Sequence, residues 1–350
     1  MPGTRTLNKA AKAANGPTMD QLIDIATRFY VTGESQIAIA RNMGLDASTV
    51  SRYLKRARDE GIVRVEIQRP RSLHGDLALE LAQDFKLKRA VVVAGDSGAG
   101  ATQAVARAAA DYVNSQLVNG MRLGLSWGRM LSAAIHLLPP GTVSNLDISL
   151  LHGGVGSAGA GIQGVELARH IASLHPHSQV HYLHAPVLVD SPDIKDAMLR
   201  DGSIRAALES AASRDIALVG IGTLDEGAPL IRYGHISPKD RKRLLAAGAV
   251  GDMCTRFFTP EGEPVHVLDE RLIAIEWAEL KRIPLVVAMA AGLEKRDAIL
   301  GALRAGCVNV LVTDEATARA VLKASNLRGE PPPQSGGPGG ASSRRTPLRG

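Results

Sequence analysis

From residue 73 onward, short runs of aliphatic and β-branched residues alternate with stretches of helical periodicity, such as 128–138, 204–213, 239–247 and 296–305. Parallel strands need a crossover connection, usually a helix, so this alternation indicates βαβ units. It predicts an α/β body with a mostly parallel, Rossmann-like sheet. The predicted strands are 90–94, 122–126, 148–151, 180–183, 216–220, 272–275, 285–289 and 308–313.

Several predicted strands end in turns rich in Gly and Ser. In open α/β sheets, ligands bind at the carboxyl ends of strands, so these turns are the first place to expect a site. For any single turn, a tight strand-to-helix connection is the alternative explanation. The turns are 95–98, Ser126-Trp127-Gly128, Gly153-Gly154 and 220–222.

These turns and the polar residues near them are candidates for binding an anionic small molecule. A helix N-terminus after Ser126 favours an anion, and Arg129 adds a bidentate donor. Lys295 supplies a point charge before helix 296–305, and Asp252 and Asp269 are candidate acceptors for hydroxyl groups. A surface or capping role is the alternative for Lys295 and Asp252. The full candidate set is Ser126, Trp127, Gly128, Arg129, Gly153, Gly154, Gly222, Thr223, Asp252, Asp269 and Lys295.

Residues 18–70 show a different layout: a helix, a short helix, a turn at Gly44, a third helix and then a strand. This order is typical of a winged helix-turn-helix, and Asp46 is the expected N-cap of the third helix. The alternating run 62–67 fits either the wing or the first strand of a linker.

The outer face of the third helix carries short hydroxyls first and cations after them. Hydroxyls at its start suit base edges in the major groove, and the later cations suit phosphates. An ordinary solvated amphipathic helix is the alternative. The predicted DNA contacts are Gln36, Ser48, Thr49, Ser51, Arg52, Lys55 and Arg56.

The formal net charge of +6 is unevenly distributed along the chain. Residues 1–71 carry +5, residues 72–327 carry −2 and residues 328–350 carry +3. A basic N-terminal region on a slightly acidic body suggests a nucleic-acid-binding head with a second function behind it. Surplus cations that only aid solubility are the alternative explanation of the charge. We therefore expect a disordered basic tail (1–17), a DNA-binding domain (18–70), an effector and oligomerisation domain (71–327) and a disordered Pro/Gly/Ser-rich tail (328–350).

Several motifs together resemble the SorC family of sugar-binding transcriptional regulators, over roughly residues 18–325. The helix-turn-helix segment is "SQIAIARNMGLDASTVSRYLKRARDEGIVRVEI", which starts at Ser35. The body motifs follow in the family's order: "GLSWGR" (124–129), "LVGIGTL" (218–224), "GAVGDMCTRFF" (248–258), "EKRDAILGALRAG" (294–306) and "VLVTDEATARAVL" (310–322).

The resemblance implies an effector domain similar in fold to sugar-phosphate isomerases and glucosamine-phosphate deaminases. It implies a sugar, sugar phosphate or polyol effector that controls binding to double-stranded operator DNA, and a homodimer or homotetramer. One position departs from the family, which often has Thr where this chain has Met130. That departure leaves an uncharged sugar or polyol open as the effector.

An enzyme of the same fold is the alternative hypothesis. Deaminases of this fold carry Asp-Gly-His just after the Gly-Ile-Gly turn, but here Thr223-Leu224-Asp225 follows, and His235 is the nearest histidine downstream. We expect no catalytic residues and no cofactor. A metal is not expected either, because the five histidines between 170 and 184 match no ligand spacing. Two cysteines and no membrane-length apolar run predict a cytoplasmic protein.

Overall fold

The computed structural model describes residues 17–63, 74–94, 99–154 and 163–326. The chain divides into two compact units, Met1–Pro70 and Arg71–Gly350, here called the head and the body. The predicted tails, apart from Pro17, and the turn 95–98 lie outside the described residues, as does the wing strand beyond Val63. Among the described residues, no helix is long and apolar enough to cross a membrane.

The head is a bundle of three helices: α1 (Met19–Tyr30), α2 (Gln36–Met43) and α3 (Ala47–Asp59). Each begins at a side-chain cap, which is Thr18, Ser35 and Asp46 in turn. Gly44 ends α2 with φ 65°, a left-handed conformation that glycine adopts without strain. The core joins all three helices through Leu22, Ile25, Ile39, Val50 and Leu54.

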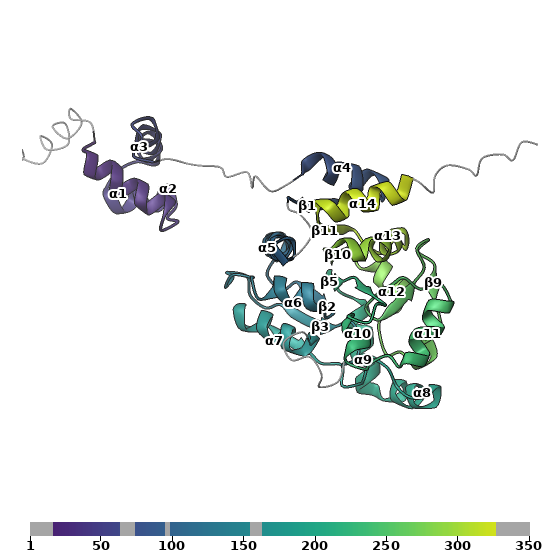
Figure 1. Cartoon of the computed structure of the whole chain (residues 1–350). Coiled ribbons are helices and arrows are strands. Elements are labelled where there is room, and N and C mark those ends of the chain that lie inside the picture. The colour runs from purple at the N-terminus through teal and green to yellow at the C-terminus, as the bar shows by residue number, and fades with distance from the viewer. Residues whose placement is uncertain (1–16, 64–73, 95–98, 155–162, 327–350) are drawn as a thin grey trace, which may run out of the picture. The chain divides into compact units, whose positions relative to one another are not determined.

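The body is built on a seven-stranded parallel sheet with the order β1-β11-β10-β5-β2-β3-β4 (Figure 1). Helices pack on both faces: α5, α6 and α7 contribute to one core, and α4, α13 and α14 to the other. Because both faces are covered, strands such as β5 are buried almost throughout. The strands are β1 (Arg89–Val93), β2 (Arg122–Leu125), β3 (Asp147–Leu150), β4 (Gln179–His181), β5 (Ile216–Gly220), β10 (Leu285–Met289) and β11 (Val310–Asp314).

The helices of the body connect these strands. The main ones are α4 (Gly75–Asp84), α5 (Ala99–Gln116), α6 (Arg129–Ile135), α7 (Gly164–Leu174), α8 (Pro192–Arg200), α9 (Gly202–Ala212), α11 (Pro238–Ala246), α13 (Arg296–Arg304) and α14 (Glu315–Asn326). Shorter turns of helix are α10 (Pro229–Arg232), α12 (Trp277–Arg282), η1 (Asp269–Arg271) and η2 (Leu293–Lys295).

The chain reverses its direction across the sheet between β2 and β5. After β2 it continues to β3 and β4 on one side, whereas after β5 it continues to β10 and β11 on the other. The connections that leave the carboxyl ends of β2 and β5 therefore diverge, and they leave a crevice between them. This topological switch point is where a ligand site is expected in an open parallel sheet.

A second, antiparallel sheet of four short strands was not predicted from the sequence. It consists of β6 (Gly222–Thr223), β7 (Gly251–Met253), β8 (Arg256–Phe258) and β9 (Pro264–Val265). The predicted strand 272–275 is wrong: Leu272 and Ala274 form only isolated bridges, to Leu188 and His152. Its residues are apolar because they are buried against the body, rather than because they join a sheet.

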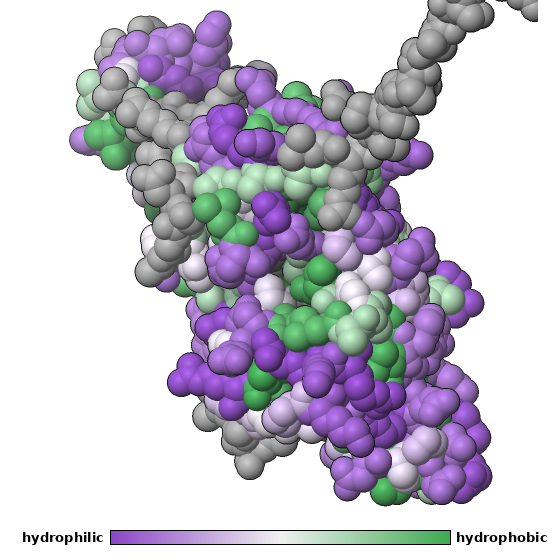
Figure 2. Space-filling view, turned by 45° about the vertical axis from the view of Figure 1, so that its right-hand side comes forward, coloured by the Kyte–Doolittle hydropathy of each residue, from purple (hydrophilic) through white to green (hydrophobic). Residues whose placement is uncertain are grey.

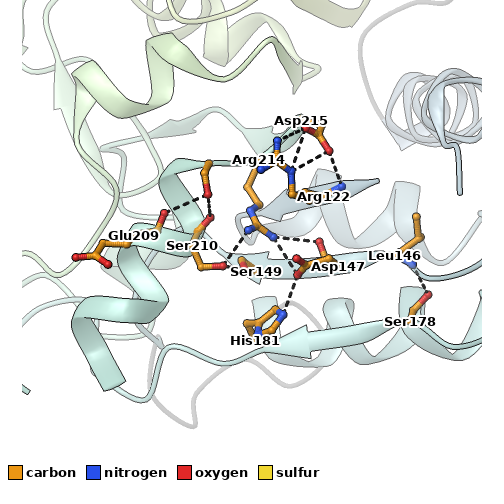
Figure 3. A network of polar contacts seen from close by, with 11 residues as sticks. Arg122, Leu146, Asp147, Ser149, Ser178, His181, Glu209, Ser210, Arg214 and Asp215 are labelled. Carbon is orange, nitrogen blue, oxygen red and sulfur yellow. Dashed lines mark hydrogen bonds and ion pairs between the residues drawn. The ribbon is translucent and has the colours of Figure 1, made fainter. Parts of the chain in front are cut away.

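A polar network joins β2, β3, β4 and β5 away from the switch-point crevice (Figure 3). The Arg214 guanidinium, which is 5% exposed, donates to Ser210 Oγ (2.9 Å) and pairs with Asp147 (3.0 Å). His181 contacts the same carboxylate at 2.8 Å, and Arg122 pairs with Asp215 at 2.6 Å. These contacts fix the amino ends of β2, β3 and β5.

Figure 2 shows one face of the molecule, on which hydrophobic residues lie in separate patches among hydrophilic ones. The large hydrophobic side chains exposed on the body belong to different segments, among them Leu79 of α4, Ile194 of α8 and Leu245 of α11. Scattered exposure of this kind is normal for a protein surface.

Candidate functional site

A cavity of about 70 Å³ lies at the switch point, between the segments that follow β2 and β5. This cavity is here called the switch-point cavity. Its polar lining combines eight of the predicted residues, namely Ser126, Trp127, Gly128, Arg129, Gly222, Thr223, Asp252 and Lys295.

Two cations reach the switch-point cavity from opposite sides. Arg129 is the first residue of α6, after β2, whereas Lys295 ends η2, after β10. Lys295 Nζ donates to the Ile221 carbonyl oxygen at 2.7 Å. Burial lowers the pKa of Lys295, and the positive charge of Arg129 lowers it further. An anion between the two cations would relieve both effects.

Asp252 is the buried acid of the cavity. Its carboxylate accepts the Thr255 backbone N–H at 3.1 Å and lies so close to Gly222 that a Cβ there would collide with it. Burial raises the pKa of Asp252 to about 6, although Thr255 and Lys295 act in the opposite direction. Near neutral pH this carboxyl therefore exchanges between an acceptor and a donor form.

The loop after β2 has a backbone that only glycine accepts readily. Gly128 has φ 129° and ψ 163°, a region populated almost solely by glycine. The following helix, α6, has seven residues, which is shorter than the sequence predicts. Met130 is 8% exposed and places a thioether in the cavity wall where the family often has a hydroxyl.

Ser126 contacts a histidine that sequence reasoning missed. Ser126 Oγ lies 3.2 Å from Nε2 of His152, and both residues are buried. Trp127 packs edge-on against the same imidazole with ring centroids 6.4 Å apart. The sequence contains one signal for this residue, which is that His152 directly precedes the predicted Gly153-Gly154 turn. Cys254, which also lines the cavity, was likewise missed.

Three predicted effector residues lie outside the switch-point cavity. Asp269 does not line this cavity: its carboxylate pairs with Arg256 (3.3 Å), the first residue of β8, and with His266 (2.6 Å). Gly153 is also misplaced; a Cβ on it would lie 2.6 Å from the Pro186 carbonyl, so it serves a close backbone approach.

Gly154 lines a separate cavity of about 320 Å³, together with His235, Asp240 and Arg271. The ring of His235 meets that of Trp127 at 6.0 Å, so this second cavity neighbours the wall of the first. Thr223 does line the switch-point cavity, but its hydroxyl donates to Asp225, so it is already engaged.

On the head, the predicted DNA contacts lie on the exposed or half-exposed faces of α2 and α3. The Asp46 carboxylate caps α3 and accepts hydrogen bonds from Ser48 Oγ (2.5 Å) and Thr49 Oγ1 (2.9 Å). These bonds, with that from the Thr49 N–H, lower the pKa of Asp46 to about 2. Both hydroxyls therefore donate to Asp46 and keep lone pairs as acceptors, and Thr49 Oγ1 already accepts from the Arg52 guanidinium at 3.4 Å.

The cations of α3 differ in how they are held. Arg56 pairs with Glu60 at 2.5 Å, and the Arg52 guanidinium lies 5.8 Å from the centre of the Tyr53 ring. Lys55 is exposed, as are Ser51 and Arg58. Gln36 is half-buried at the first position of α2. Arg56 thus already has an acidic partner, whereas Lys55 is exposed.

The histidines between 170 and 184 do not form one cluster. His175 is buried, whereas His181 and His184 are exposed. His170 stacks on His136 with ring centroids 4.8 Å apart, which joins α7 to α6. Within the described residues, no group of three or more His, Cys, Asp or Glu side chains is arranged to hold a metal ion.

Comparison with known proteins assigns both units. Residues 72–323 match the family model of a sugar-binding domain, and residues 33–64 match a winged helix-turn-helix DNA-binding model. The chain is 31% identical over 318 residues to the sorbitol operon regulator of Klebsiella pneumoniae, covering 88% of this chain and 99% of the relative. It is 30% identical over 303 residues to the deoxyribonucleoside regulator of Bacillus subtilis, covering 86% and 96%.

Solved structures of transcriptional regulators are also similar to this chain. The full-length sorbitol operon regulator SorC from Klebsiella pneumoniae has a TM-score of 0.64 at 30% identity and covers 86% of this chain and 98% of its own. A transcriptional regulator from Streptococcus pneumoniae has a TM-score of 0.68 at 27% identity, covering 72% and 97%.

Proposed function

Because the chain belongs to the SorC family of sugar-binding transcriptional regulators, we propose that its effector is a sugar with an anionic group, bound in the switch-point cavity. The effector would alter operator binding only through its different affinities for the DNA-competent and DNA-incompetent arrangements of the protein. By name, the relatives given above are a sorbitol operon regulator and a deoxyribonucleoside regulator, which supports an effector of the carbohydrate class.

The observation that carries this proposal is the approach of Arg129 and Lys295 to one cavity. Burial and the charge of Arg129 disfavour the charged form of Lys295, although nearby carboxylates, among them Asp252, act in the opposite direction, and a bound anion would favour that form further. A phosphate group supplies that anion, with Arg129 as a bidentate donor and Lys295 as a point charge. Asp252 would then accept a hydroxyl of the sugar.

Met130 favours a second candidate, an uncharged sugar or polyol. The thioether stands where a hydroxyl donor would assist a phosphate, and it presents an apolar surface instead. In that case Asp252 and Thr223 would supply the specificity, and the two cations would hydrogen-bond to hydroxyls.

For the head, we propose that α3 enters the major groove. Ser48, Thr49, Ser51 and Arg52 would face base edges, and Lys55 and Arg56 would face phosphates, with Gln36 on the adjoining backbone. Paired half-sites require at least a homodimer, so we propose a homodimer or homotetramer assembled through the body. We also propose a cytoplasmic location, because the proposed role is on operator DNA.

We also propose that the body binds its effector without converting it, since the relatives are named as regulators. The carboxylate of Asp225, in the segment where deaminases of this fold carry catalytic residues, accepts the Thr223 hydroxyl. Incubation with each sugar phosphate that binds, followed by product analysis, tests this point. Any turnover would favour the enzyme hypothesis.

A thermal-shift screen of the full chain against sugars, sugar phosphates and polyols tests the effector class. A ligand at one hundred times its Kd stabilises the protein by about 2.7 kcal/mol, which shifts the melting temperature measurably. A sugar phosphate that binds while its unphosphorylated sugar does not would support the anion site. Binding by neutral compounds alone would remove the phosphate from the proposal and favour the second candidate.

A further inference from the structure

We propose that His152 is a positioning residue that takes the proton of the Ser126 hydroxyl, so that Ser126 accepts a hydrogen bond from an effector hydroxyl and rejects an anionic oxygen. The inference rests on the proposed function, because it assumes that the effector enters the switch-point cavity. It adds that a hydroxyl of the effector, and not its anionic group, lies beside Ser126.

The first step concerns the tautomer of His152. Its Nδ1 lies 2.8 Å from the carbonyl oxygen of Gly153, and its Nε2 lies 3.2 Å from Ser126 Oγ. A carbonyl oxygen only accepts, so Nδ1 must carry a proton. In the neutral ring the other nitrogen is then an acceptor. The Gly153 carbonyl therefore fixes which nitrogen faces Ser126.

The second step concerns the charge of the ring. His152 is 4% exposed, and burial lowers its pKa to about 4. The ring is therefore neutral near neutral pH, and Nε2 keeps its lone pair. A doubly protonated ring, which would donate to Ser126, is disfavoured because no carboxylate among the described residues is hydrogen-bonded to it.

The third step follows the single proton of the Ser126 hydroxyl. His152 Nε2 and the Cys254 thiol are both close enough to compete for it. Burial raises the pKa of Cys254 to about 12, so the thiol stays protonated, and a thiol sulfur is a weak acceptor. The imidazole nitrogen takes the proton, and Ser126 is left with lone pairs only.

As a consequence, different residues of the cavity bind different groups of the effector. A phosphate oxygen, which is an acceptor, is repelled by the lone pairs of Ser126 and is directed to Arg129 and Lys295. A hydroxyl of the sugar can donate to Ser126. The cavity thus distinguishes the two ends of a sugar phosphate by hydrogen-bond polarity as well as by charge.

The first experiment measures the tautomer directly in the full chain. A long-range ¹⁵N–¹H NMR spectrum at neutral pH distinguishes a proton on Nδ1 from one on Nε2. We expect the His152 signal to show the Nδ1–H form, and an Nε2–H form would overturn the inference. This measurement needs no ligand, so it separates the inference from the proposed function.

The second experiment uses two probes with the same phosphate, glycerol 3-phosphate and propyl phosphate, which differ in their hydroxyls. In the unchanged protein, we expect glycerol 3-phosphate to bind about tenfold more tightly, by calorimetry or chemical-shift titration. Ser126→Ala removes one acceptor and leaves Asp252, so it should reduce this preference several-fold. An unchanged preference in Ser126→Ala would overturn the inference.

His152→Leu provides the matched test of positioning. It frees the Ser126 hydroxyl to donate, so propyl phosphate should bind no more weakly than before while the preference for hydroxyls falls. If this variant does not fold, Ser126→Ala and the tautomer measurement still decide. If neither probe binds the unchanged protein at millimolar concentration, the anion site of the proposed function fails, whatever the tautomer.

Discussion

The ammonium group of Lys295 lies 2.7 Å from the backbone carbonyl oxygen of Ile221. This bond joins the segment after β10 to the segment after β5, and both residues line the switch-point cavity. Since a ligand anion would compete with that carbonyl for the ammonium group, effector binding can change how these two segments are held. The contribution of Lys295 to effector binding can therefore be tested by substitution.

Lys295→Met should weaken binding of a sugar phosphate by at least about tenfold, because a charge-assisted hydrogen bond is worth about 1.5–3 kcal/mol. The fold should persist, since Met occupies a similar volume and has no charge to dehydrate. Isothermal titration with the sugar phosphate that gives the largest thermal shift measures the effect. Lys281→Met, which removes an exposed lysine from α12, is the control. Unchanged affinity in Lys295→Met would exclude the anion site.

Arg52→Ala and Lys55→Ala should weaken DNA binding in different ways. A base contact by Arg52 predicts a loss of about 1–3 kcal/mol that depends on the sequence of the operator. A phosphate contact by Lys55 predicts a uniform loss, and the salt dependence of log Kd should fall in slope by about 0.9. Fluorescence anisotropy on an operator selected from random DNA measures both. If both variants bound like Lys281→Ala, α3 would not be the recognition helix.

Asp252→Asn should stabilise the protein at alkaline pH and have little effect at acidic pH. The folded pKa of about 6 exceeds the unfolded value of 3.8, so the folded state holds more protons between them. The stability contributed by the protonated carboxyl is therefore full below the lower pKa and lost as pH rises through the higher one. The difference corresponds to about 3 kcal/mol, less the loss of a counter-charge for Lys295.

Urea unfolding of both forms from about pH 4 to pH 8 checks this expectation. His152 titrates in the same window with the opposite sign, because burial lowers its pKa to about 4. Its contribution is common to both proteins and cancels in the difference. A difference that does not grow with pH would contradict the buried, proton-binding state of Asp252.

Arg256→Met should destabilise the body by about 1–3 kcal/mol, the usual cost of leaving a buried hydrogen-bond acceptor without its donor. The Arg256 side chain is 2% exposed; it donates to the carbonyls of Ile275 and Ala274 and pairs with Glu276 at 2.6 Å. It thereby holds the second sheet against the segment 272–276. Chemical denaturation measures the loss.

The exposed pair of Arg296 and Asp297 supplies the control for that experiment. Surface ion pairs contribute about 0–1 kcal/mol, so Arg296→Met should change the unfolding midpoint little. Equal effects in the two variants would show that Arg256 acts as a surface charge, contrary to its burial.

The parallel sheet was predictable because its strands are buried on both faces and so appear as continuous aliphatic runs. Strands 216–220 and 285–289 were predicted with the bounds that the structure shows. The second sheet was not predictable, because β6 and β9 have two residues each, and an alternation of apolar and polar residues cannot be recognised over two residues. The family and the regulatory class of function are confirmed by the family models and the relatives.

Prediction of the candidate site depended on local sequence. Residues that directly follow β2 and β5 were found, because the carboxyl ends of strands are recognisable in the sequence. Asp269 lies outside the cavity and His152 was missed, because their contacts depend on which segments pack together: Asp269 pairs with Arg256, and His152 contacts Ser126. The DNA-contact residues and the effector residues stay predictions until binding is measured.

The pairing of β1 with β11 has a consequence for synthesis on the ribosome. The head depends on contacts close in sequence and can fold as soon as it leaves the exit tunnel. The first strand of the body, in contrast, hydrogen-bonds to its last strand. Until β11 has been translated, the nascent chain carries β1 unpaired, so chaperones that shield strand edges are expected to associate with the body and not with the head.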